Sequence, residues 1–435
     1  MANIQQYFEK FNETIRTGYK YNEELKEKRN KLLDNLKNNL DLTFSHFNQG
    51  SYGMGTGVKP IDGDFDIDVG LVFRENSNEI LDCPFQLKSK VGQALKHVRR
   101  TVKIKRPCVT VQYVEDGEDK YHVDFAIYKE NQFGELFFAR GKSLDDEELN
   151  WESVDPKELV SLIKEKYPEG QKRKQYKRCI RALKRWKSYK LNHKNLPSIA
   201  ITVAAYQYFE PKFYDDNEDL PNDVEALITF LDNLAACLID KYLLLPTKPN
   251  SNLLENLTDK QSQELIAKLR KLKDDLESSQ DESSSPKDAC KKMKKHFGQD
   301  FPLPEGTNLS TEEFIEEKFA LSKELRPLYL SMEISNYNSL IYSVLSRFDR
   351  DLKLIPKGRT LTFKVENAQD FIGCDFYWKV MNIGREAERY GIRGQINKGG
   401  VTQIEHSTFP GEHYVECYAI EDGVCIARET IEVPI

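Results

Sequence analysis

The run DFDIDVGLVF at residues 64–73 constrains the fold of this chain more than any other segment. Apolar residues alternate with acidic ones along its first half, which is typical of a strand with one buried face. In such a strand Asp66 and Asp68 project together from the face opposite the buried side chains. The core-facing residues would be Phe65, Ile67, Val69, Leu71 and Phe73. The sequence therefore predicts a β-sheet that carries two neighbouring carboxylates on one face.

Neighbouring carboxylates repel each other, and each raises the pKa of the other unless a cation lies between them. Oxygen ligands in this arrangement suit Mg²⁺, which binds carboxylates together with substrate phosphates. For a solitary Asp-x-Asp pair, the alternative is a solvated acidic strand end. Two further segments favour a metal site over this alternative.

The first of these segments is YHVDFAI at residues 121–127, in which apolar residues again alternate with polar ones. A strand here would bury Val123, Phe125 and Ile127 and present Asp124 on the opposite face. A third carboxylate on a neighbouring strand completes a site for two Mg²⁺ ions, with Mn²⁺ as the other candidate. The sequence therefore indicates that Asp124 acts together with the Asp66/Asp68 pair.

The second segment is a loop with four glycines between Gly50 and Gly57. Gly50 and Ser51 allow close backbone approach, and their N–H groups and the Ser51 hydroxyl can hold a triphosphate. The loop is not a Walker A motif, because Lys59 is followed by Pro60. All three parts in chain order favour a nucleotide site.

Residue periodicity divides the chain into a mixed α/β part, a mostly helical part and a β-rich end. In the first part we expect helix at 3–44, strands at 66–73, 108–114 and 121–128, and a helix at 85–100. Helices at 171–191 and 198–209 are expected within the helical part, which covers 156–296. The serine-rich acidic stretch 277–286 predicts a mobile loop, and the proline-containing stretch 300–309 predicts a domain boundary. A helix near 339–348 is expected before strands around 361–365, 377–380, 414–418 and 424–427.

The overall composition excludes several classes of protein. The 435 residues include 64 basic and 70 acidic side chains, and this net charge of −6 argues against a globally basic nucleic-acid binder. The eight cysteines form no CxxC pair, so we expect unpaired thiols in a reducing compartment. The polar N-terminal segment matches neither a secretory signal nor a transit peptide, and no apolar run reaches the ~20 residues of a membrane span. We therefore expect a soluble, cytoplasmic protein without a membrane partner.

In chain order, Gly50-Ser51, Asp66-x-Asp68 and Asp124 resemble the hG[GS], DxD and third-carboxylate motifs of the DNA polymerase β-like nucleotidyltransferases. Within that superfamily, residues 1–302 are similar to bacterial cyclic-oligonucleotide synthases, the cyclic GMP-AMP synthase/DncV-like (CD-NTase) family. The segments behind this resemblance are DGDFDIDVGLVF at 62–73, RALKRWK at 181–187 and KHFGQDFP at 295–302. Residues 325–435 resemble the adenylyl/guanylyl and SMODS-type C-terminal sensor domain. The segments behind this second resemblance are YWKVMNIG at 377–384, IRGQI at 392–396 and GEHYVECYAI at 411–420.

The resemblance implies an α/β fold: a polymerase β-like core with a mixed sheet, a helical C-lobe and a smaller β-rich C-terminal domain. The expected boundaries are 1–302 for core and helical lobe, 303–324 for a linker and 325–435 for the sensor-like domain. In similar enzymes a lysine of the helix at 171–190 contacts the donor triphosphate, which indicates Lys184, with Lys187 as the reserve. The resemblance gives Ser198 a phosphate contact as well, although a serine there also serves as an ordinary helix N-cap. Most of the ten basic side chains of that helix are expected on a solvated face.

The activity that the resemblance implies is the joining of ATP- or GTP-type nucleotides into a cyclic di- or trinucleotide. Asp66, Asp68 and Asp124 would hold the metal ions, and the product would be a second messenger in bacterial antiphage (CBASS) signalling that switches on an effector protein. One alternative is a nucleotidyltransferase that modifies a protein, an RNA end or a small molecule. The other is a catalytically silent nucleotide sensor. The ligand of the C-terminal domain, the bases, the ring size and the 2′ or 3′ linkage stay open.

A second basic stretch, residues 88–106, has eight Lys or Arg and no acidic residue. Eukaryotic relatives bind an activating nucleic acid, whereas the bacterial relatives mostly lack that requirement. Given the acidic total charge, we expect no nucleic-acid partner.

Overall fold

The computed structural model describes most of the chain and divides it into two compact units. The described residues are 3–17, 19–61, 65–74, 82–98, 100–115, 118–191, 196–281, 284–304, 312–335, 342–343, 355–382, 393–408 and 410–435. The N-terminal unit comprises residues 8–185 and 198–256, and the C-terminal unit comprises residues 1–7, 186–197 and 257–435. Within the described part of the chain, no helix combines the length and apolarity needed to cross a bilayer.

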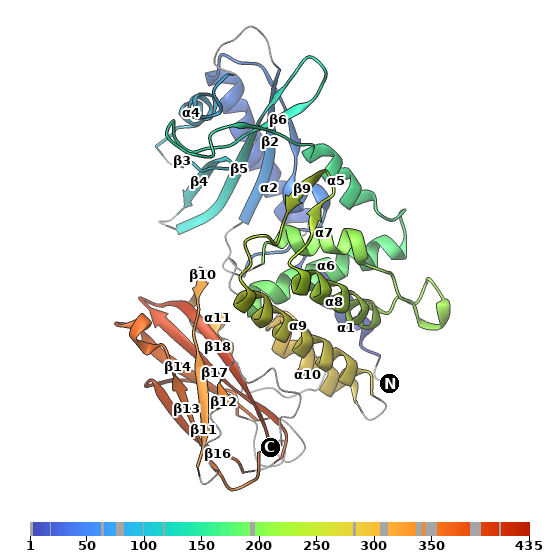
Figure 1. The fold of residues 1–435 in the computed structure, drawn as a ribbon, viewed down its shortest axis with the longest axis vertical. Helices are drawn as coiled ribbons and strands as arrows, with labels where there is room; N and C mark the ends of the chain where they lie inside the picture. Colours follow the sequence, from blue (N-terminus) through green and yellow to red (C-terminus); the bar gives the residue numbers. More distant parts are fainter. Residues whose placement is uncertain are drawn as a thin grey trace. The chain divides into compact units, whose positions relative to one another are not determined.

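A seven-stranded mixed sheet organises the N-terminal unit (Figure 1). Five strands run in the order β1-β2-β5-β4-β3, and β6 and β7 extend from β5. Only β2 and β5 pair in parallel, and the other neighbours in this sheet are antiparallel. The bounds are β1 Phe44–Asn48, β2 Phe65–Arg74, β3 Arg100–Ile104, β4 Val109–Glu115, β5 Glu118–Glu130, β6 Leu136–Ala139 and β7 Trp151–Ser153. The expected mixed sheet is thus confirmed.

Helices cover the apolar face of this sheet. Three leucines of α2 (Tyr19–Asn39), Leu40 just after it, and the apolar side of α4 (Pro84–Ala94) share one core with the strands. Ile67, Val69 and Phe125 are each at most 1% exposed in that core. Because side chains alternate along a strand, the intervening residues of β2 and β5 lie on the other face. The sheet therefore has one face covered by helices and one face that carries the acidic residues.

The remaining helices of the N-terminal unit pack around α6. Their bounds are α1 Gln5–Ile15, α3 Gly50–Met54, α5 Pro156–Glu165, α6 Gln171–Lys190, α7 Ser198–Tyr208 and α8 Asp223–Asp240, with the 3₁₀ helix η2 at Tyr214–Asp216 and the hairpin β8 Leu244–Leu245 and β9 Lys248–Asn252. α1 and α6 each contribute residues to both units. The expected helices at 171–191 and 198–209 are confirmed.

The expectation of a solvated basic face on α6 is wrong. Among its ten basic side chains only Lys174 is exposed, because α6 lies at the centre of the helical part. The buried cations have acceptors: Arg178 donates to both carboxylate oxygens of Asp223, at 2.6 and 2.8 Å. Arg181 donates to Asn12 Oδ1 and to the Gly55 carbonyl oxygen. A basic sequence run here marks a buried, hydrogen-bonded helix rather than a solvated surface.

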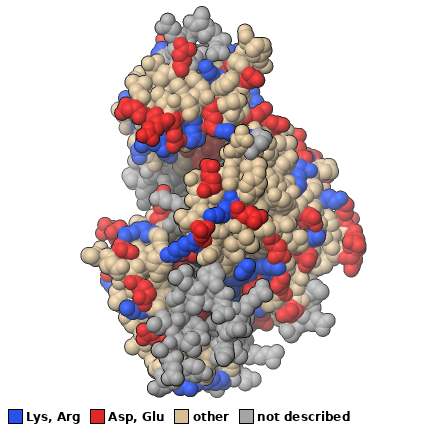
Figure 2. Space-filling model, in the orientation of Figure 1, with Lys and Arg blue, Asp and Glu red and all other residues tan. Residues whose placement is uncertain are grey.

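The second basic stretch, residues 88–106, does not form a continuous exposed basic surface either. Lys88 is fully buried and donates to the backbone carbonyls of Lys105, Arg106 and Gly141. Arg106 pairs with Asp146. On the face drawn in Figure 2, acidic and basic side chains are interspersed.

In its described residues, the C-terminal unit combines α-helices with two β-sheets. Its larger sheet has the order β10-β18-β17-β14-β15 and its smaller sheet the order β12-β11-β13-β16. Residues of both sheets, among them Phe363, Trp378 and Cys417, share one core. The helices are α9 Asp259–Ser279, α10 Pro286–Phe297 and α11 Ile315–Lys318, with the 3₁₀ helix η4 at Ala368–Phe371. The strands are β10 Ala320–Arg326, β11 Leu330–Ile334, β12 Tyr342–Ser343, β13 Thr360–Val365, β14 Asp375–Met381, β15 Ile396–Gly399, β16 Thr402–His406, β17 Glu412–Glu421 and β18 Val424–Pro434.

Several predicted boundaries need correction. The predicted helix at 3–44 is two helices followed by the start of β1. The helix near 339–348 is wrong at Tyr342–Ser343, which pair with β11, and its other residues lie outside the described part. The polar loop after α9 is shorter than predicted, because Ser279 is still helical and buried. Within the predicted linker 303–324, α11 and the start of β10 are ordered, and β10 pairs in parallel with β18. Residues 62–64, 383–384 and 392, within three of the segments that carry the family resemblance, are not described.

All eight cysteines lie in described segments and none forms a disulfide. Six of the thiols are buried. They therefore act as small apolar side chains in the cores.

A buried charge cluster ties α6 to the larger sheet within the C-terminal unit. The Lys379 Nζ atom lies 2.9 Å from Glu312 Oε1 and 3.4 Å from Glu416 Oε2, and Lys379 is 1% exposed. Lys190, near the end of α6, lies 3.7 Å from Glu416 Oε1, and the Tyr418 hydroxyl donates to Glu416 Oε2. Burial alone would raise the pKa of Glu416, but Lys379 and Lys190 outweigh it and lower that pKa to about 2.

We predict that Glu416→Gln destabilises the larger sheet by about 3–5 kcal/mol, because it leaves buried lysines without their counter-charge. Amide hydrogen exchange of peptides from β14 and β17 measures this loss as a lower free energy of opening. Since the pKa of Glu416 is lowered, its stabilising charge is fully present above pH 4.5 and is lost as the pH falls towards 2. Glu421→Gln, at an exposed position of the same strand, is the matched control. Unchanged protection in Glu416→Gln would contradict the prediction.

Candidate active site

The parallel pairing of β2 with β5 builds the candidate site. In its register Asp66 lies opposite His122, and Asp68 lies opposite Asp124. Cross-strand partners project from the same face of a sheet, so all four side chains share the face opposite α2 and α4. The structure thus brings together the three carboxylates that the sequence analysis singled out, with a histidine among them.

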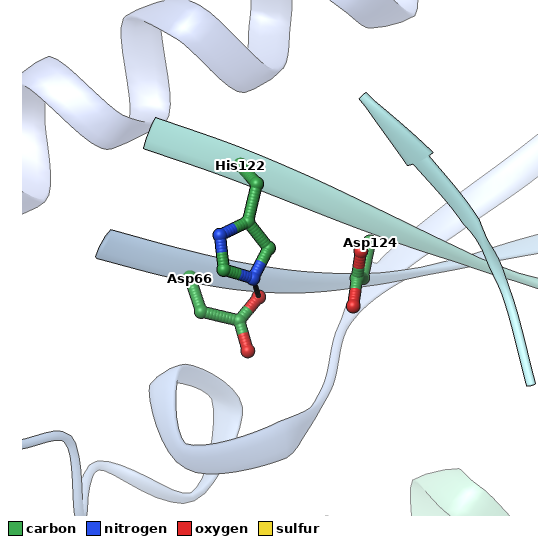
Figure 3. Close-up of side chains that lie close together, drawn as sticks. All are labelled: Asp66, His122 and Asp124. Atoms are coloured by element: carbon green, nitrogen blue, oxygen red, sulfur yellow. Dashed lines mark ion pairs between the residues drawn. The ribbon is translucent and has the colours of Figure 1, made fainter. Parts of the chain in front are cut away.

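The closest grouping in this site contains two carboxylates and the imidazole. Ligand atoms of Asp66, His122 and Asp124 all lie within 4.8 Å of one another. His122 Nε2 is 3.4 Å from Asp66 Oδ1, and Figure 3 shows the Asp124 carboxylate beside this pair. Asp68 is not part of this tight group in the described part of the chain. It lies beside the short helix α3 instead.

Gly50 of α3 lies so close to the Asp68 carboxylate that only a residue without a side chain fits there. Its φ of +58° is in the left-handed region, and a Cβ atom added here would lie 1.8 Å from Asp68 Oδ2. The backbone also connects the two elements, because the Gln49 N–H donates to the Asp68 carbonyl oxygen at 3.1 Å. Any side chain at position 50 would displace the Asp68 carboxylate. The structure therefore explains why glycine precedes Ser51 in this loop.

The electrostatics of the site disfavour its charged form when no cation is present. Loss of surrounding water, followed by the charge of Asp68, raises the pKa of Asp66 to about 7. Loss of water, followed by the charge of Asp124, raises the pKa of Asp68 to about 6. The Asp66 side chain is still 48% accessible, so an incoming ion or substrate can reach it. The site would gain free energy from a cation that neutralises this repulsion.

Asp124 provides a separate sign that a group is missing. Its Oδ1 atom is buried and has no hydrogen-bond partner among the described residues. A buried acceptor without a partner is costly in a folded protein. Carboxylate oxygens are the ligands that Mg²⁺ and Mn²⁺ prefer. The residues present therefore fit a divalent cation, which Asp66, Asp68 and Asp124 could hold.

The predicted phosphate-binding residues differ in their surroundings. Lys184 is buried, and its Nζ atom lies 2.9 Å from Thr56 Oγ1, just beyond α3. Its charge also lowers the pKa of Asp68 against the effect of burial, which places the ammonium group within electrostatic reach of the carboxylates. Ser51 lies in α3 and is partly exposed. The structure brings Lys184, Gly50 and Ser51 to the α3 loop.

Lys187 and Ser198 are the other two predicted phosphate-binding residues. Lys187 is buried, belongs to the C-terminal unit, and has its pKa lowered to about 8 by burial. Ser198 is the exposed first residue of α7, and its carbonyl oxygen accepts a hydrogen bond from Thr202.

Sequence reasoning missed His122. The signal was available, because His122 precedes Asp124 by two residues and so lies on the same face of the strand. Pairing with Asp66 required the register of two strands that are far apart in the sequence. The alternation of polar and apolar residues therefore indicated the strand face on which His122 lies. Only the pairing of β2 with β5 showed that Asp66 is its neighbour.

Two family models match the chain. Residues 45–128 match the model described as "Cyclic GMP-AMP synthase DncV-like, nucleotidyltransferase domain". Residues 309–435 match "Adenylyl/Guanylyl and SMODS C-terminal sensor domain". The first match contains β1 to most of β5, with all three carboxylates, and the second contains both sheets of the C-terminal unit.

Similar proteins agree with these matches. A cyclic GMP-AMP synthase from Escherichia albertii is 25% identical over 431 residues, covering 93% of this chain and 88% of the relative. The solved CD-NTase CdnG of Bradyrhizobium diazoefficiens, in complex with GTP, is 12% identical with a TM-score of 0.53, over 67% of this chain and 94% of CdnG. CdnC of E. coli, in a CdnC:HORMA complex, is 16% identical with a TM-score of 0.51, over 68% of this chain and 98% of CdnC. The two solved structures support the fold.

The domain matches, the curated relative and the mixed sheet with its acidic face agree in one assignment. The chain is a nucleotidyltransferase similar to the CD-NTase family of cyclic-nucleotide synthases, and its residues 309–435 match a C-terminal sensor domain.

Proposed function

We propose that this enzyme joins nucleoside triphosphates into a cyclic di- or trinucleotide, using Asp66, Asp68 and Asp124 to hold two divalent cations. The observation that carries this proposal is the register of β2 and β5, which collects the carboxylates on one face, with Asp124 Oδ1 buried and unpaired among the described residues. The similarity to a cyclic GMP-AMP synthase over 93% of the chain supports the cyclic product.

The reaction forms one phosphorus–oxygen bond and breaks another. A ribose hydroxyl of one nucleotide attacks the α-phosphate of the next, and pyrophosphate leaves. When bound, two Mg²⁺ ions lower the pKa of the attacking hydroxyl and neutralise charge on the phosphate. Asp124 helps to position the nucleotide that carries the attacking ribose hydroxyl, or accepts the proton of that hydroxyl. A second round within the linear intermediate closes the ring.

The α3 loop and α6 would bind the leaving triphosphate tail. Gly50 and Ser51 offer backbone N–H groups and a hydroxyl, and Lys184 offers a buried ammonium group that already contacts this loop at Thr56. Charge-assisted hydrogen bonds to phosphate are stronger than neutral ones. Lys187 and Ser198 are kept as further phosphate-binding candidates.

The wider role follows from the family. The cyclic product would be a second messenger in bacterial antiphage (CBASS) defence, acting in the cytoplasm on a separate effector protein. The C-terminal unit would sense a ligand that regulates synthesis, which fits the sensor-domain match over residues 309–435.

Asp66→Asn and Asp124→Asn are expected to lower the rate of pyrophosphate release at least about 100-fold, because each removes part of a metal site worth several kcal/mol in the transition state. Circular dichroism should show an unchanged fold. Asp41→Asn, at an exposed position before β1, is the control and should keep wild-type activity. Turnover near wild type in both site variants would refute the metal assignment.

Incubation with Mg²⁺ and labelled nucleoside triphosphates should give a small nucleotide that resists phosphatase, since a ring has no terminal phosphate. Mass spectrometry of this product identifies its bases and ring size, and Asp66→Asn is the negative control. Label on a protein, an RNA end or a small acceptor would favour transfer of single nucleotides instead. Nucleotide binding without any pyrophosphate release would favour a silent sensor.

The pH dependence of metal binding follows from the raised pKa values of Asp66 and Asp68. Below about pH 7 the metal-free site holds protons that a cation must displace. These carboxyl groups therefore stabilise the metal-free protein at low pH and destabilise it as the pH rises towards 7. The increase in melting temperature on adding Mg²⁺ should be larger at pH 8 than at pH 6. Asp66→Asn should reduce this difference, and equal increases at both pH values would contradict the assignment.

A further inference from the structure

The proposed metal site contains a nitrogen donor that the three-carboxylate arrangement does not require. His122 lies opposite Asp66 across the β2–β5 pair and two residues before Asp124 on the same strand. Its side chain is 18% accessible, so the imidazole is largely enclosed by the site. In Figure 3 the ring lies on the Asp66 side, with its Nε2 atom pointing to the aspartate, and the Asp124 carboxylate stands next to it.

The distances fit a shared cation. Ligand atoms bound to one ion at about 2.1 Å lie about 3 Å apart when adjacent and about 4.2 Å apart when opposite. Atoms of Asp66, His122 and Asp124 already lie within 4.8 Å of one another. His122 Nε2 and Asp66 Oδ1, at 3.4 Å, have close to the separation of adjacent ligands. Small side-chain movements would therefore complete a set of one nitrogen and two oxygens.

We propose that His122 Nε2 is a ligand of one of the two divalent cations, and that this nitrogen makes the site select Mn²⁺ over Mg²⁺. This inference rests on the proposed function, because it assumes that the carboxylates bind metal. Mg²⁺ prefers oxygen ligands, whereas an imidazole nitrogen suits transition metals. Replacing one oxygen ligand by this nitrogen therefore favours Mn²⁺ without excluding Mg²⁺.

A competing explanation gives His122 only an indirect role. In that case the imidazole hydrogen-bonds Asp66 and orients it, as groups around a metal site commonly do. The two explanations differ in a measurable way. A positioning residue changes the affinity for both metals in the same proportion, whereas a nitrogen ligand changes their ratio and is in direct contact with the bound ion.

The test measures metal binding at equilibrium rather than turnover. We expect His122→Asn to weaken Mn²⁺ binding at least about tenfold and Mg²⁺ binding by much less, so the ratio of the two affinities falls. Electron paramagnetic resonance of free Mn²⁺, with Mg²⁺ as competitor, gives both constants for the full-length protein. His97→Asn, at an exposed position of the same unit, is the matched control and should keep the wild-type ratio.

A spectroscopic readout tests the contact itself. Electron spin echo modulation of protein-bound Mn²⁺ should show a directly bound nitrogen in the wild type and in His97→Asn, and should lose it in His122→Asn. An equal loss of affinity for both metals, or a nitrogen signal that survives in His122→Asn, would overturn the inference. Asp66→Asn separates this outcome from failure of the proposed function. If Asp66→Asn abolishes Mn²⁺ binding and His122→Asn leaves the ratio of the two affinities unchanged, only the proposed role of His122 is wrong. If Asp66→Asn still binds Mn²⁺ as the wild type does, the metal site of the proposed function is itself refuted.

Discussion

The parallel pairing of β2 and β5 is the constraint on which the candidate site depends. It holds Asp66 beside His122 and Asp68 beside Asp124, although like charges at this spacing repel each other. Burial of the opposite face against α2 and α4 supplies the free energy that keeps these side chains together. A shift of one residue in the register would turn the carboxylates into the core and the apolar residues out. The acidic face of the sheet is therefore maintained by the apolar face behind it.

Helix α6 connects the chemistry of the two units. Its Lys184 belongs to the N-terminal unit and contacts the α3 loop, and its Lys190 belongs to the C-terminal unit and pairs with Glu416. The two lysines are six positions apart in the sequence, which is about 9 Å along a continuous helix. A buried cation requires a counter-charge or a hydrogen-bond acceptor. The basic side chains of α6 therefore bind partners within the unit to which each belongs, in addition to packing there. This explains how so basic a helix can have most of its cationic side chains wholly or partly buried.

The sequence predicted much of the fold because polar and apolar residues alternate along strands such as β13, whose apolar side chains line a core. The strands around Ile67 and Val123 and the helix at 171–190 lie where periodicity placed them. The periodicity of the sequence gave a wrong prediction where pairing with a distant strand determines the secondary structure of a segment. Tyr342 pairs with β11 despite a helical pattern, and Phe44 opens β1 at the end of a run that looked helical. The solvated face expected for α6 failed for the same reason, because exposure depends on what packs around a helix.

For the candidate site, the sequence by itself determined which carboxylates share a strand face, since the period of two is a local property of the backbone. It also indicated the glycine-serine loop and, through resemblance, the enzyme family. Only the tertiary structure decided that His122 lies beside Asp66, that Gly50 leaves space for Asp68, and that most basic side chains of α6 are wholly or partly buried. These three facts depend on contacts between segments distant in the chain, and the free energy of such contacts comes from the packing of the whole unit rather than from any one segment.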